Sequence, residues 1–269
     1  MKEIDVGDWQ AFQQKLRDLR DGLGQGSSPL LFRGQGNSEW QLKTTLERAG
    51  RDRMKFSGYY ELISRIRPVV ETFTESNWEF PDYSGEETEA SFRDYDAFSH
   101  FPSVPAYAYM VYLRHHGFPS PLLDWSRSPS VAAFFAFREP YPDPGNWSIY
   151  VFCEMPRGLK AWSNQSPRIR RIGPYVRSHR RHFRQQSDYT ICARFEQTWH
   201  FWDYESVFVP STPVPIEQDV LWKFNLPSTQ RVAVLRSFDE YNLNAFSLFD
   251  SEEALLETMW LRELTLREK

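Results

Sequence analysis

The chain has 269 residues, of which 41% are hydrophobic and 16% aromatic, including 10 tryptophans. This composition excludes extensive disorder, and the length allows one substantial hydrophobic core. A formal net charge of −4 argues against a surface that binds nucleic acid uniformly, although a local basic patch can still act within an acidic protein.

The N-terminal half carries mostly helical patterns, in which apolar residues recur every three or four positions. The expected elements are a helix over residues 7–21, a strand over 30–33, a short helix over 45–48, a helix over 59–73 and a helix over 107–113. Pro68 lies inside the second long helix and is expected to kink it. Residues 75–103 mix acidic, small and aromatic residues without a steady period, which predicts an irregular surface insertion.

The C-terminal half adds most of the strands. Alternating patterns predict strands over residues 148–153, 189–193, 206–209 and 221–226. The helices expected in this half cover residues 130–138, 227–241 and 254–261. Ser128 is in position to N-cap the first of these helices, Pro129 to begin it, and Ser228 to N-cap the second. Together the patterns predict a single domain of the α+β class, with a mainly antiparallel sheet flanked by helices.

The cysteines and the apolar runs indicate the cellular compartment in which the protein is expected. Cys153 and Cys192 both have apolar neighbours, which favours two buried reduced thiols over a disulfide and fits a reducing cytoplasm. The charged start of the chain is unlike a signal peptide, and no apolar run reaches the roughly 18 residues that a membrane-spanning helix needs. We therefore expect a cytoplasmic protein with no membrane segment.

The segment LFRGQG at residues 31–36 is the first that suits ligand chemistry. Arg33 follows an apolar strand, so its guanidinium can bind a phosphate or a carboxylate through paired hydrogen bonds. The backbone of Gly34 and Gln35 would add amide donors and close approach to the ligand. The alternative is structural, because Arg33 can instead pair with a carboxylate at the edge of the core, such as Asp124.

The second segment that suits ligand chemistry is HHGFPSPLLDWSRSP at residues 115–129. Asp124 lies between two large apolar residues, so it must be paired or hydrogen-bonded to stay charged. Its expected partners are Arg33, Arg127 or the backbone amides of the following turn. Ser126 and Ser128 flank the start of the next helix, where their hydroxyls can cap the backbone or contact the phosphate or ribose of a ligand.

Histidine chemistry is limited to one candidate. His115 and His116 are adjacent, and successive side chains of a helix diverge, which excludes the usual ligation of one metal ion by both. No HExxH, CxxC or Gly-x-Ser-x-Gly motif supports a metal-dependent hydrolase or an acyl-transfer enzyme, so we expect no metal. His115 either orients a ligand or transfers protons, or it is a half-buried histidine of the turn.

Residues 168–186 form a basic segment with no acidic residue. Its arginines alternate with Tyr175 and Phe183, a pattern typical of a surface that follows a nucleic-acid backbone. The candidate nucleic-acid-binding residues are Arg168, Arg170, Arg171, Arg177, Arg180, Arg181 and Arg184. The alternative is a solvated basic loop that balances the acidic stretch at residues 75–96.

Taken together, residues 32–34 and 115–129 resemble the two signature blocks of the FRG domain family. The resemblance spans about residues 28–250, with an irregular insertion near residues 75–103. Gln186, ahead of a strand, also matches a family position. The chain departs from the family at Pro121, where the pattern has a polar residue before Leu-Leu-Asp.

A more distant similarity links these residues to ADP-ribosyltransferases of the Arg-Ser-Glu type. In those enzymes an Arg-Gly strand, then a Ser-x-Ser segment and an alanine-rich helix, occur in the order seen here. The similarity implies an ADP-ribosyltransferase-like core with NAD as the substrate. The implied NAD-binding residues are Arg33, Gly34, Gln35, Asp124, Trp125, Ser126 and Ser128. The implied catalytic residues are Arg33, His115, Ser126 and Gln186.

The carboxylate that such enzymes place beside the ribose is missing from the expected position, which carries Gln185 and Gln186. This substitution predicts weak transfer or a pocket that binds without turnover. The leading hypothesis is an effector or toxin-like protein that transfers ADP-ribose from NAD, or cleaves NAD, with nucleic acid as the acceptor. The alternative is a non-catalytic module that binds nucleic acid or nucleotide, and a third interpretation makes residues 75–103 a protein-binding surface.

Overall fold

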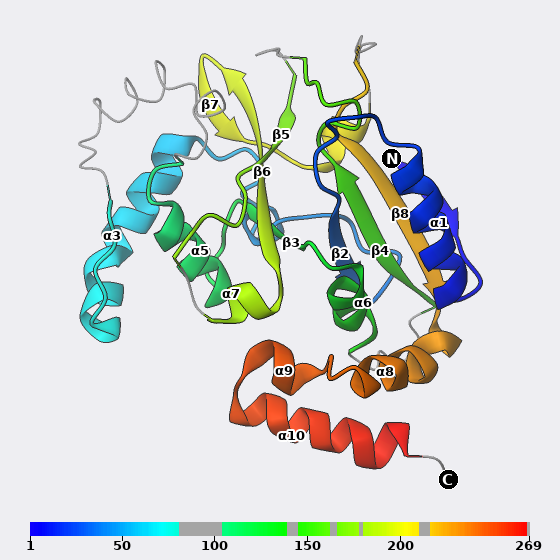
Figure 1. Cartoon of the computed structure of the whole chain (residues 1–269). Coiled ribbons are helices and arrows are strands. Elements are labelled where there is room, and N and C mark those ends of the chain that lie inside the picture. The colour runs from blue at the N-terminus through cyan, green and yellow to red at the C-terminus, as the bar shows by residue number, and fades with distance from the viewer. Residues whose placement is uncertain (81–103, 139–144, 162–165, 178–179, 210–215, 268–269) are drawn as a thin grey trace.

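One mixed β-sheet organises the protein (Figure 1). The computed structural model describes residues 1–80, 104–138, 145–161, 166–177, 180–209 and 216–267. Within these ranges eight strands form the sheet in the order β1-β8-β4-β2-β3-β6-β5, and β7 pairs with β6. The strands are β1 (Lys2–Asp5), β2 (Leu31–Gln35), β3 (Leu122–Ser126), β4 (Asn146–Cys153), β5 (Arg168–Arg171), β6 (Ser187–Glu196), β7 (Thr198–Phe201) and β8 (Val220–Pro227).

Helices pack around this sheet (Figure 1): α1 lies beside β8, α3 and α5 lie beyond β6, and α8 to α10 are stacked across one end. The α-helices are α1 (Trp9–Asp21), α2 (Thr45–Arg48), α3 (Phe56–Thr74), α5 (Tyr107–His115), α6 (Pro129–Phe137), α7 (Arg180–Arg184), α8 (Arg231–Glu240), α9 (Ala245–Phe249) and α10 (Glu252–Trp260). Two short 3-10 helices, η1 (Glu205–Phe208) and η2 (Ser228–Gln230), and a π-helix, η3 (Leu261–Leu266), complete the described elements.

The strand pairing is antiparallel except between β1 and β8. This confirms the expected α+β fold with a mainly antiparallel sheet. The ladder is long on both sides of the centre, because β2 pairs with β4, and β3 with β6, over five residues each. Between β2 and β3, however, only Phe32 and Ser126 are paired. We call this short join the seam.

Three buried apolar clusters fill the space between the sheet and its helices. The first packs α1, α6, α8, α9 and the C-terminal helices against β4 and β8, the second packs α3 and α5 against β6 and β7, and the third covers the opposite face of the central strands. Successive residues enter different clusters, as the pleat requires: Leu31 the third and Phe32 the first, Leu122 the second and Leu123 the third. The central strands are therefore covered on both faces.

Most of the elements expected from the sequence are confirmed to within a few residues. The best example is α6, which begins at Pro129 after the N-cap Ser128, whose side-chain oxygen accepts a hydrogen bond from the amide of Val131 at 3.3 Å. Pro68 lies inside α3, which continues to Thr74. Of the expected insertion at residues 75–103, the part from residue 81 onward lies outside the described residues.

Two expectations were wrong. Residues 206–209, expected as a strand, lie largely in η1, because the amide of Ser206 donates to the carboxylate of Asp203 and its hydroxyl to the carbonyl of Asp203. These local hydrogen bonds favour a turn over a strand. Ser228 does not cap α8 either: its amide donates to the carbonyl of Gly145, and α8 begins after Gln230 without a side-chain cap.

Both cysteines are buried free thiols, as expected. Burial raises the pKa of Cys153 and of Cys192, which keeps both thiols protonated and inert. Among the helices that the structure describes, none is long and apolar enough to span a bilayer. The same described residues hold no group of three or more histidine, cysteine or acidic side chains arranged to bind a metal ion.

Candidate functional site

A cavity of about 230 Å³ lies at the seam. Its wall comes from β2, α2, β3, α6 and the turn that enters β6, so segments distant in sequence meet here. The wall residues are Phe32, Arg33, Gly34, Gln35, Gly36, Trp40, Arg48, Asp124, Trp125, Ser126, Ala132, Phe135, Gln185 and Ser187. All but one of the residues predicted to bind NAD are among them; the exception is Ser128.

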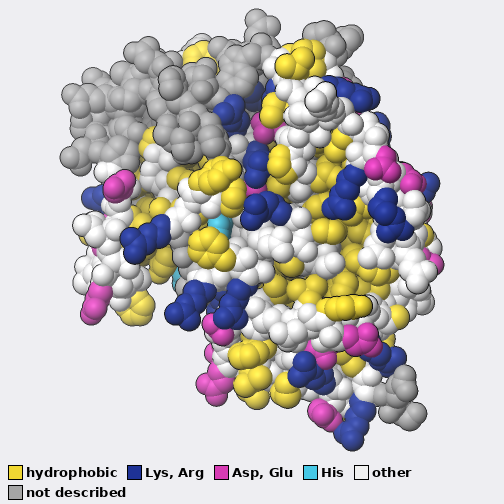
Figure 2. Space-filling view, viewed as in Figure 1, with side chains coloured by type: hydrophobic (Ala, Val, Ile, Leu, Met, Phe, Trp, Pro, Cys, Tyr) yellow, Lys and Arg dark blue, Asp and Glu magenta, His cyan; other side chains and the backbone are white. Residues whose placement is uncertain are grey.

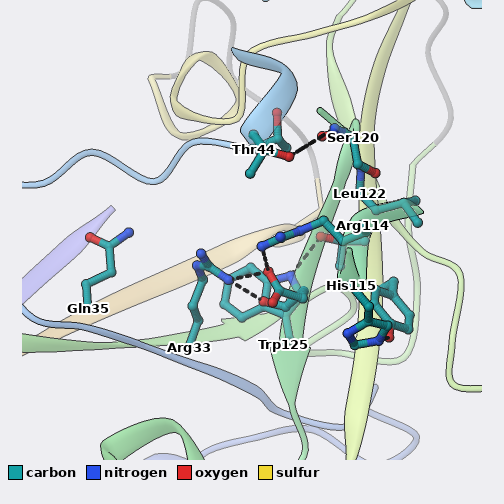
Figure 3. A network of polar contacts seen from close by, with 12 residues as sticks. Arg33, Gln35, Thr44, Arg114, His115, Ser120, Leu122 and Trp125 are labelled. Carbon is teal, nitrogen blue, oxygen red and sulfur yellow. Dashed lines mark hydrogen bonds and ion pairs between the residues drawn. The ribbon is translucent and has the colours of Figure 1, made fainter. Parts of the chain in front are cut away.

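Two arginines converge on one carboxylate beside this cavity (Figure 3). Nη1 of Arg33 lies 2.5 Å from Oδ1 of Asp124, and Nη2 of Arg114 lies 2.7 Å from the same oxygen. Nη1 of Arg33 also donates to the main-chain carbonyl of Asp124 at 2.8 Å. The structural alternative for Arg33, a pair with Asp124, is therefore present, and Arg114 joins it from the end of α5.

The electrostatics of this cluster favour a charged Asp124. Burial alone would raise the pKa of its carboxyl group, but the positive charges of Arg114 and Arg33 outweigh burial and hold that pKa well below its usual range. A carboxylate bound in this way is an acceptor of hydrogen bonds. It is poorly suited to act as a general acid, because it does not hold a proton at neutral pH.

Arg48, the last residue of α2, brings a third guanidinium to the cavity. Burial and the positive charges of Arg33 and Arg114 lower its pKa, so the three cations lie within electrostatic reach of one another. Asp124 and Glu47 are the carboxylates that act on Arg48 in the opposite sense. Among the described residues, the guanidinium of Arg48 makes no hydrogen bond or ion pair. It can therefore bind an anion without breaking an existing contact.

Aromatic side chains supply the apolar part of the wall. Phe32, Trp125 and Phe135 line the cavity, and Trp40 lines it with 40% of its surface exposed. An exposed indole in the wall of a cavity provides a stacking surface for a planar ring. The cavity wall therefore combines aromatic rings with guanidinium groups.

Gly34 has a structural role that the sequence did not reveal. A Cβ atom at this position would lie 1.8 Å from the carbonyl oxygen of Ala132 and 2.8 Å from the amide nitrogen of Ala136, both in α6. Glycine is therefore needed for the close approach of α6 to β2, whether or not a ligand is bound. Gln35, next in the chain, is 4% exposed and donates through Nε2 to the carbonyl of Gln41 at 3.3 Å.

The Trp-Ser-x-Ser segment is held by contacts within the protein. Nε1 of Trp125 donates to Oγ1 of Thr190 at 2.8 Å, and the hydroxyl of Ser126 donates to the carbonyl of Gln185 at 2.8 Å. The oxygen of Ser126 also accepts from the amide of Ser128 at 3.0 Å. Ser126 thus connects the end of β3 to the turn that enters β6 and to the start of α6, which Ser128 caps.

His115 lies beside the Asp124 cluster (Figure 3) and outside the cavity wall, in a largely buried hydrogen-bonded chain. Its Nε2 is 2.7 Å from the hydroxyl of Tyr189, which is 3.1 Å from Nδ1 of His182. Nε2 of His182 is 3.1 Å from the carbonyl of Pro174, so it carries the proton and Nδ1 accepts. Tyr189 then donates to His182 and accepts from His115. Burial lowers the pKa of His115 to about 4, which leaves it neutral near pH 7.

The two glutamines ahead of β6 occupy different environments. Gln185 lines the cavity, and its Nε2 donates to the carbonyl of Leu248 at 3.4 Å. Gln186, the residue predicted to be catalytic, is exposed, lies outside the cavity wall and has a φ of +48°. Of the two glutamines, therefore, only Gln185 is placed to contact a molecule in the cavity.

The basic segment does not form one uniform surface. Arg171 pairs with the buried Asp188 at 2.6 Å, and Arg184 pairs with Asp250 at 2.8 Å. Arg168 is 4% exposed and stacks on Trp199, with 5.2 Å between its guanidinium carbon and the ring centre. Arg181 donates to the carbonyl of Phe249 at 3.1 Å. The other three candidates are Arg170, which is half-buried, and Arg177 and Arg180, which are exposed.

Arg48, Arg114 and Trp40 were not predicted from the sequence. Arg114 directly precedes His115, and its orientation toward Asp124 depends on how α5 packs beside β3. Arg48 and Trp40 lie between β2 and α3, and nothing in their local pattern distinguishes them from surface residues. In the sequence Arg48 directly follows Glu47, so it does not stand out as a cation without an acidic neighbour.

A comparison with known protein families matches residues 28–144 to the FRG domain. This range contains both signature segments, so the resemblance inferred from the sequence is confirmed there. No curated protein and no solved structure matches the chain. The similarity to ADP-ribosyltransferases, and the extension of the FRG resemblance toward residue 250, stay predictions.

Proposed function

We propose that the seam cavity binds a nucleotide and that this nucleotide is NAD. The segment that matches the FRG domain, residues 28–144, supplies Arg33 and both strands of the seam. The proposed reaction is transfer of ADP-ribose from NAD, or cleavage of NAD. The observation that carries the proposal is that Arg33, Ser126 and Gln185 reach one cavity from β2, β3 and the turn into β6. This is the order of groups that the similarity to ADP-ribosyltransferases implies.

The charge of the cavity supports an anionic ligand. Arg48 carries a guanidinium without a hydrogen bond or ion pair in the described structure, and it lies near Arg33 and Arg114. Arginine binds phosphate through paired hydrogen bonds, and an arginine that has no carboxylate partner keeps its N–H groups available for them. We therefore place the pyrophosphate of NAD against Arg48, beside Arg33, whose guanidinium also joins β2 to β3.

The size of the cavity suits one part of NAD. Its volume of about 230 Å³ is below the range of roughly 300–1,000 Å³ that is usual for ligand pockets. One ring with its ribose would enter, stacked on Trp40 or Phe135, and the other half would extend outward. Nicotinamide is the half that must enter if its glycosidic bond is to be cleaved.

Turnover depends on a carboxylate. In the proposed step the bond between nicotinamide nitrogen and ribose carbon breaks, and its electron pair leaves with nicotinamide. A water or hydroxyl oxygen then bonds to that carbon, and its proton passes to the solvent. The positive charge that develops on the ribose is stabilised by an adjacent negative charge. Asp124 is shared by two arginines and Gln185 is neutral, so we expect binding with slow turnover.

The proposal is tested by calorimetric titration of the purified protein with NAD and with ADP-ribose, while nicotinamide release is followed in parallel. Saturable binding of both supports the nucleotide site, and slow release of nicotinamide supports the reaction. Absence of binding at millimolar NAD would contradict both. Binding without detectable release would favour the second candidate, a non-catalytic nucleotide-binding module, which the Arg33–Asp124 ion pair also fits.

Nucleic acid as the acceptor, or as the ligand of a binding module, has weaker support. Four of the seven candidate arginines are engaged with other parts of the protein, which leaves Arg177 and Arg180 as the exposed cations of the segment. A surface of two or three charges predicts a shallow dependence of binding on salt, because the slope follows the number of phosphates contacted. A titration with single-stranded RNA at several salt concentrations measures that slope.

A further inference from the structure

The C-terminal helices carry an unusual share of the protein's exposed large apolar residues. Of the sixteen described residues of this kind, six lie between residues 246 and 264. They are Phe246, Leu255, Leu256, Met259, Trp260 and Leu264. Five of them belong to α10 and its continuation η3, and Figure 2 shows apolar side chains gathered where Figure 1 places α9 and α10. A concentrated apolar patch on a protein surface marks a contact with another molecule.

The patch occupies one face of α10. Leu255 and Met259 are four positions apart, and so are Leu256 and Trp260, so the two pairs form neighbouring rows on one face, with exposed fractions of 38%, 63%, 38% and 44% in chain order. The opposite side of the helix packs against the rest of the protein, and Ala254, Thr258 and Leu261 are buried there. α10 is the outermost element at its end of the molecule, and no described element covers the exposed face (Figure 1).

From this arrangement we propose that the exposed face of α10 and η3 is a dimerisation surface, which binds the same face of a second copy in antiparallel orientation. A twofold contact requires a surface that is complementary to itself. Here the helix begins with an exposed acidic residue, Glu252, and an exposed basic residue, Arg267, directly follows the end of η3. An antiparallel pair places the acidic end of each helix beside the basic end of the other.

The spacing of the residues fixes the register. If Glu252 of one copy lies opposite Arg267 of the other, the twofold axis passes between Met259 and Trp260. The same register then places Leu255 opposite Leu264. It also places Leu256 opposite the aliphatic part of Glu263, whose carboxylate already pairs with Arg267 at 2.6 Å. Charge pairs at both ends and apolar pairs in the middle therefore form in one register.

The charge of the helix argues against a membrane as the occupant. Helices that lie on anionic lipid combine an apolar face with a basic flank. Here the flank contains Glu252, Glu253 and Glu263, all exposed. A second copy of this chain offers Arg267 to Glu252, whereas an anionic bilayer offers no basic group to these carboxylates.

Sedimentation velocity of the full chain between about 1 and 100 µM tests the proposal. We expect a monomer–dimer equilibrium that Met259→Glu weakens roughly tenfold or more, because each dimer then buries two carboxylates at its centre. Phe73→Glu, on the exposed end of α3, is the matched control and should leave the equilibrium unchanged. A wild-type protein that stays monomeric over this range overturns the proposal.

A charge exchange tests the register. Glu252→Arg and Arg267→Glu, as single changes, should each weaken the dimer, and the double variant should restore it. If the dimer affinity of the double variant falls by the combined losses of the two single variants, the antiparallel register is wrong. Circular dichroism of each variant checks that the fold is intact. Flotation with vesicles that contain phosphatidylserine tests whether the face binds an anionic membrane instead. Binding of the wild type to these vesicles that is lost in Met259→Glu would also overturn the proposal.

Discussion

Nη1 of Arg33 lies 2.8 Å from the main-chain carbonyl oxygen of Asp124 and 2.5 Å from its carboxylate, so one side chain of β2 bonds to both the backbone and the side chain of β3. The backbone ladder between these strands has a single residue pair, and the guanidinium supplies a further join. The arginine of the FRG segment thus stabilises the sheet at the place where the cavity opens. Loss of ligand binding in an Arg33 variant therefore has to be separated from loss of the fold.

Asp124→Asn should destabilise the protein. The change removes the negative charge that Arg33 and Arg114 share and leaves two guanidinium groups facing each other. We expect the free energy of unfolding, measured by urea denaturation, to fall by about 1–3 kcal/mol. The value lies below that for a fully buried pair, because 37% of the Asp124 side chain is exposed.

Glu196→Gln is the matched control for Asp124→Asn. Glu196 pairs with Arg194 at 3.3 Å, and both side chains are about as exposed as that of Asp124 or slightly more so. This single ion pair should contribute no more than about 0.5 kcal/mol. Equal losses in the two variants would show that the cluster around Asp124 has no special role in stability.

Gly34→Ala should be more damaging than any change of charge. The added methyl group would lie 1.8 Å from the carbonyl oxygen of Ala132, which belongs to helix backbone and cannot turn aside. We expect a loss of about 3 kcal/mol or more in the free energy of unfolding, or failure to fold. Gly7→Ala is the control, because nothing lies within 4 Å of its Cβ position, and it should unfold like the wild type. A stable Gly34→Ala protein would contradict the close contact between β2 and α6.

Arg48→Ala should weaken nucleotide binding and leave stability unchanged. A hydrogen bond from a charged donor contributes about 1.5–3 kcal/mol, so affinity for ADP-ribose should fall roughly 10- to 100-fold. The thermal midpoint should stay near that of the wild type, because the Arg48 guanidinium makes no hydrogen bond or ion pair in the described structure. Arg51→Ala, an exposed arginine three residues later and outside the cavity wall, should bind like the wild type.

Gln185→Glu should accelerate the release of nicotinamide from NAD. The variant places a carboxylate in the cavity wall, where it can stabilise positive charge on the ribose. We expect single-turnover release at saturating NAD to rise roughly tenfold or more, since one such electrostatic group contributes at least that much. Gln186→Glu changes the same residue type one position later, outside the cavity wall, and should leave the rate unchanged. The reverse result would mean that Gln186, as the sequence predicted, is the residue that faces the substrate.

His115→Gln should flatten the dependence of stability on pH. Burial lowers the pKa of His115 to about 4 in the folded protein, against 6.5 when unfolded. Between these values the unfolded state binds a proton that the folded state does not, so stability falls as the pH falls from 6.5 to 4. The share of His115 in this loss is roughly 1–3 kcal/mol.

Urea denaturation at several pH values between 4 and 7 measures the slope. His182 is affected in the same direction, again through burial, so the His115→Gln variant should retain part of the dependence. His116→Gln, the same change at the next residue, lies outside the chain from His115 through Tyr189 to His182 and is the control. If both variants lose the same amount, the chain from His115 through Tyr189 to His182 is not the source.

The sequence predicted those parts of the fold that local patterns determine. α6 follows from a serine cap, a proline and an apolar run, and the Arg33–Asp124 pair was one of two interpretations offered for Arg33. The strand expected at residues 206–209 was wrong, because hydrogen bonds to Asp203 outweigh the apolar alternation there.

The parts of the site that the sequence missed depend on tertiary packing. Arg114 reaches Asp124 because α5 packs against β3, and Arg48 reaches the cavity wall from the end of α2. The basic segment was overestimated for a related reason. Arg171 and Arg184 have acidic partners at Asp188 and Asp250, which belong to other parts of the chain and could not be assigned from composition.

The single-pair ladder at the seam divides the sheet into two blocks, with β1, β8, β4 and β2 on one side and β3, β6, β5 and β7 on the other. Within each block the strands are bonded over several residues, whereas the two blocks are joined by one backbone pair and by the contacts of Arg33 with Asp124. A molecule in the cavity would lie against both blocks, with β2 on one side and β3 on the other. Occupancy would therefore add a further contact between them. Gln185, also in the cavity wall, donates to the carbonyl of Leu248 in α9, which links the cavity to the C-terminal helices.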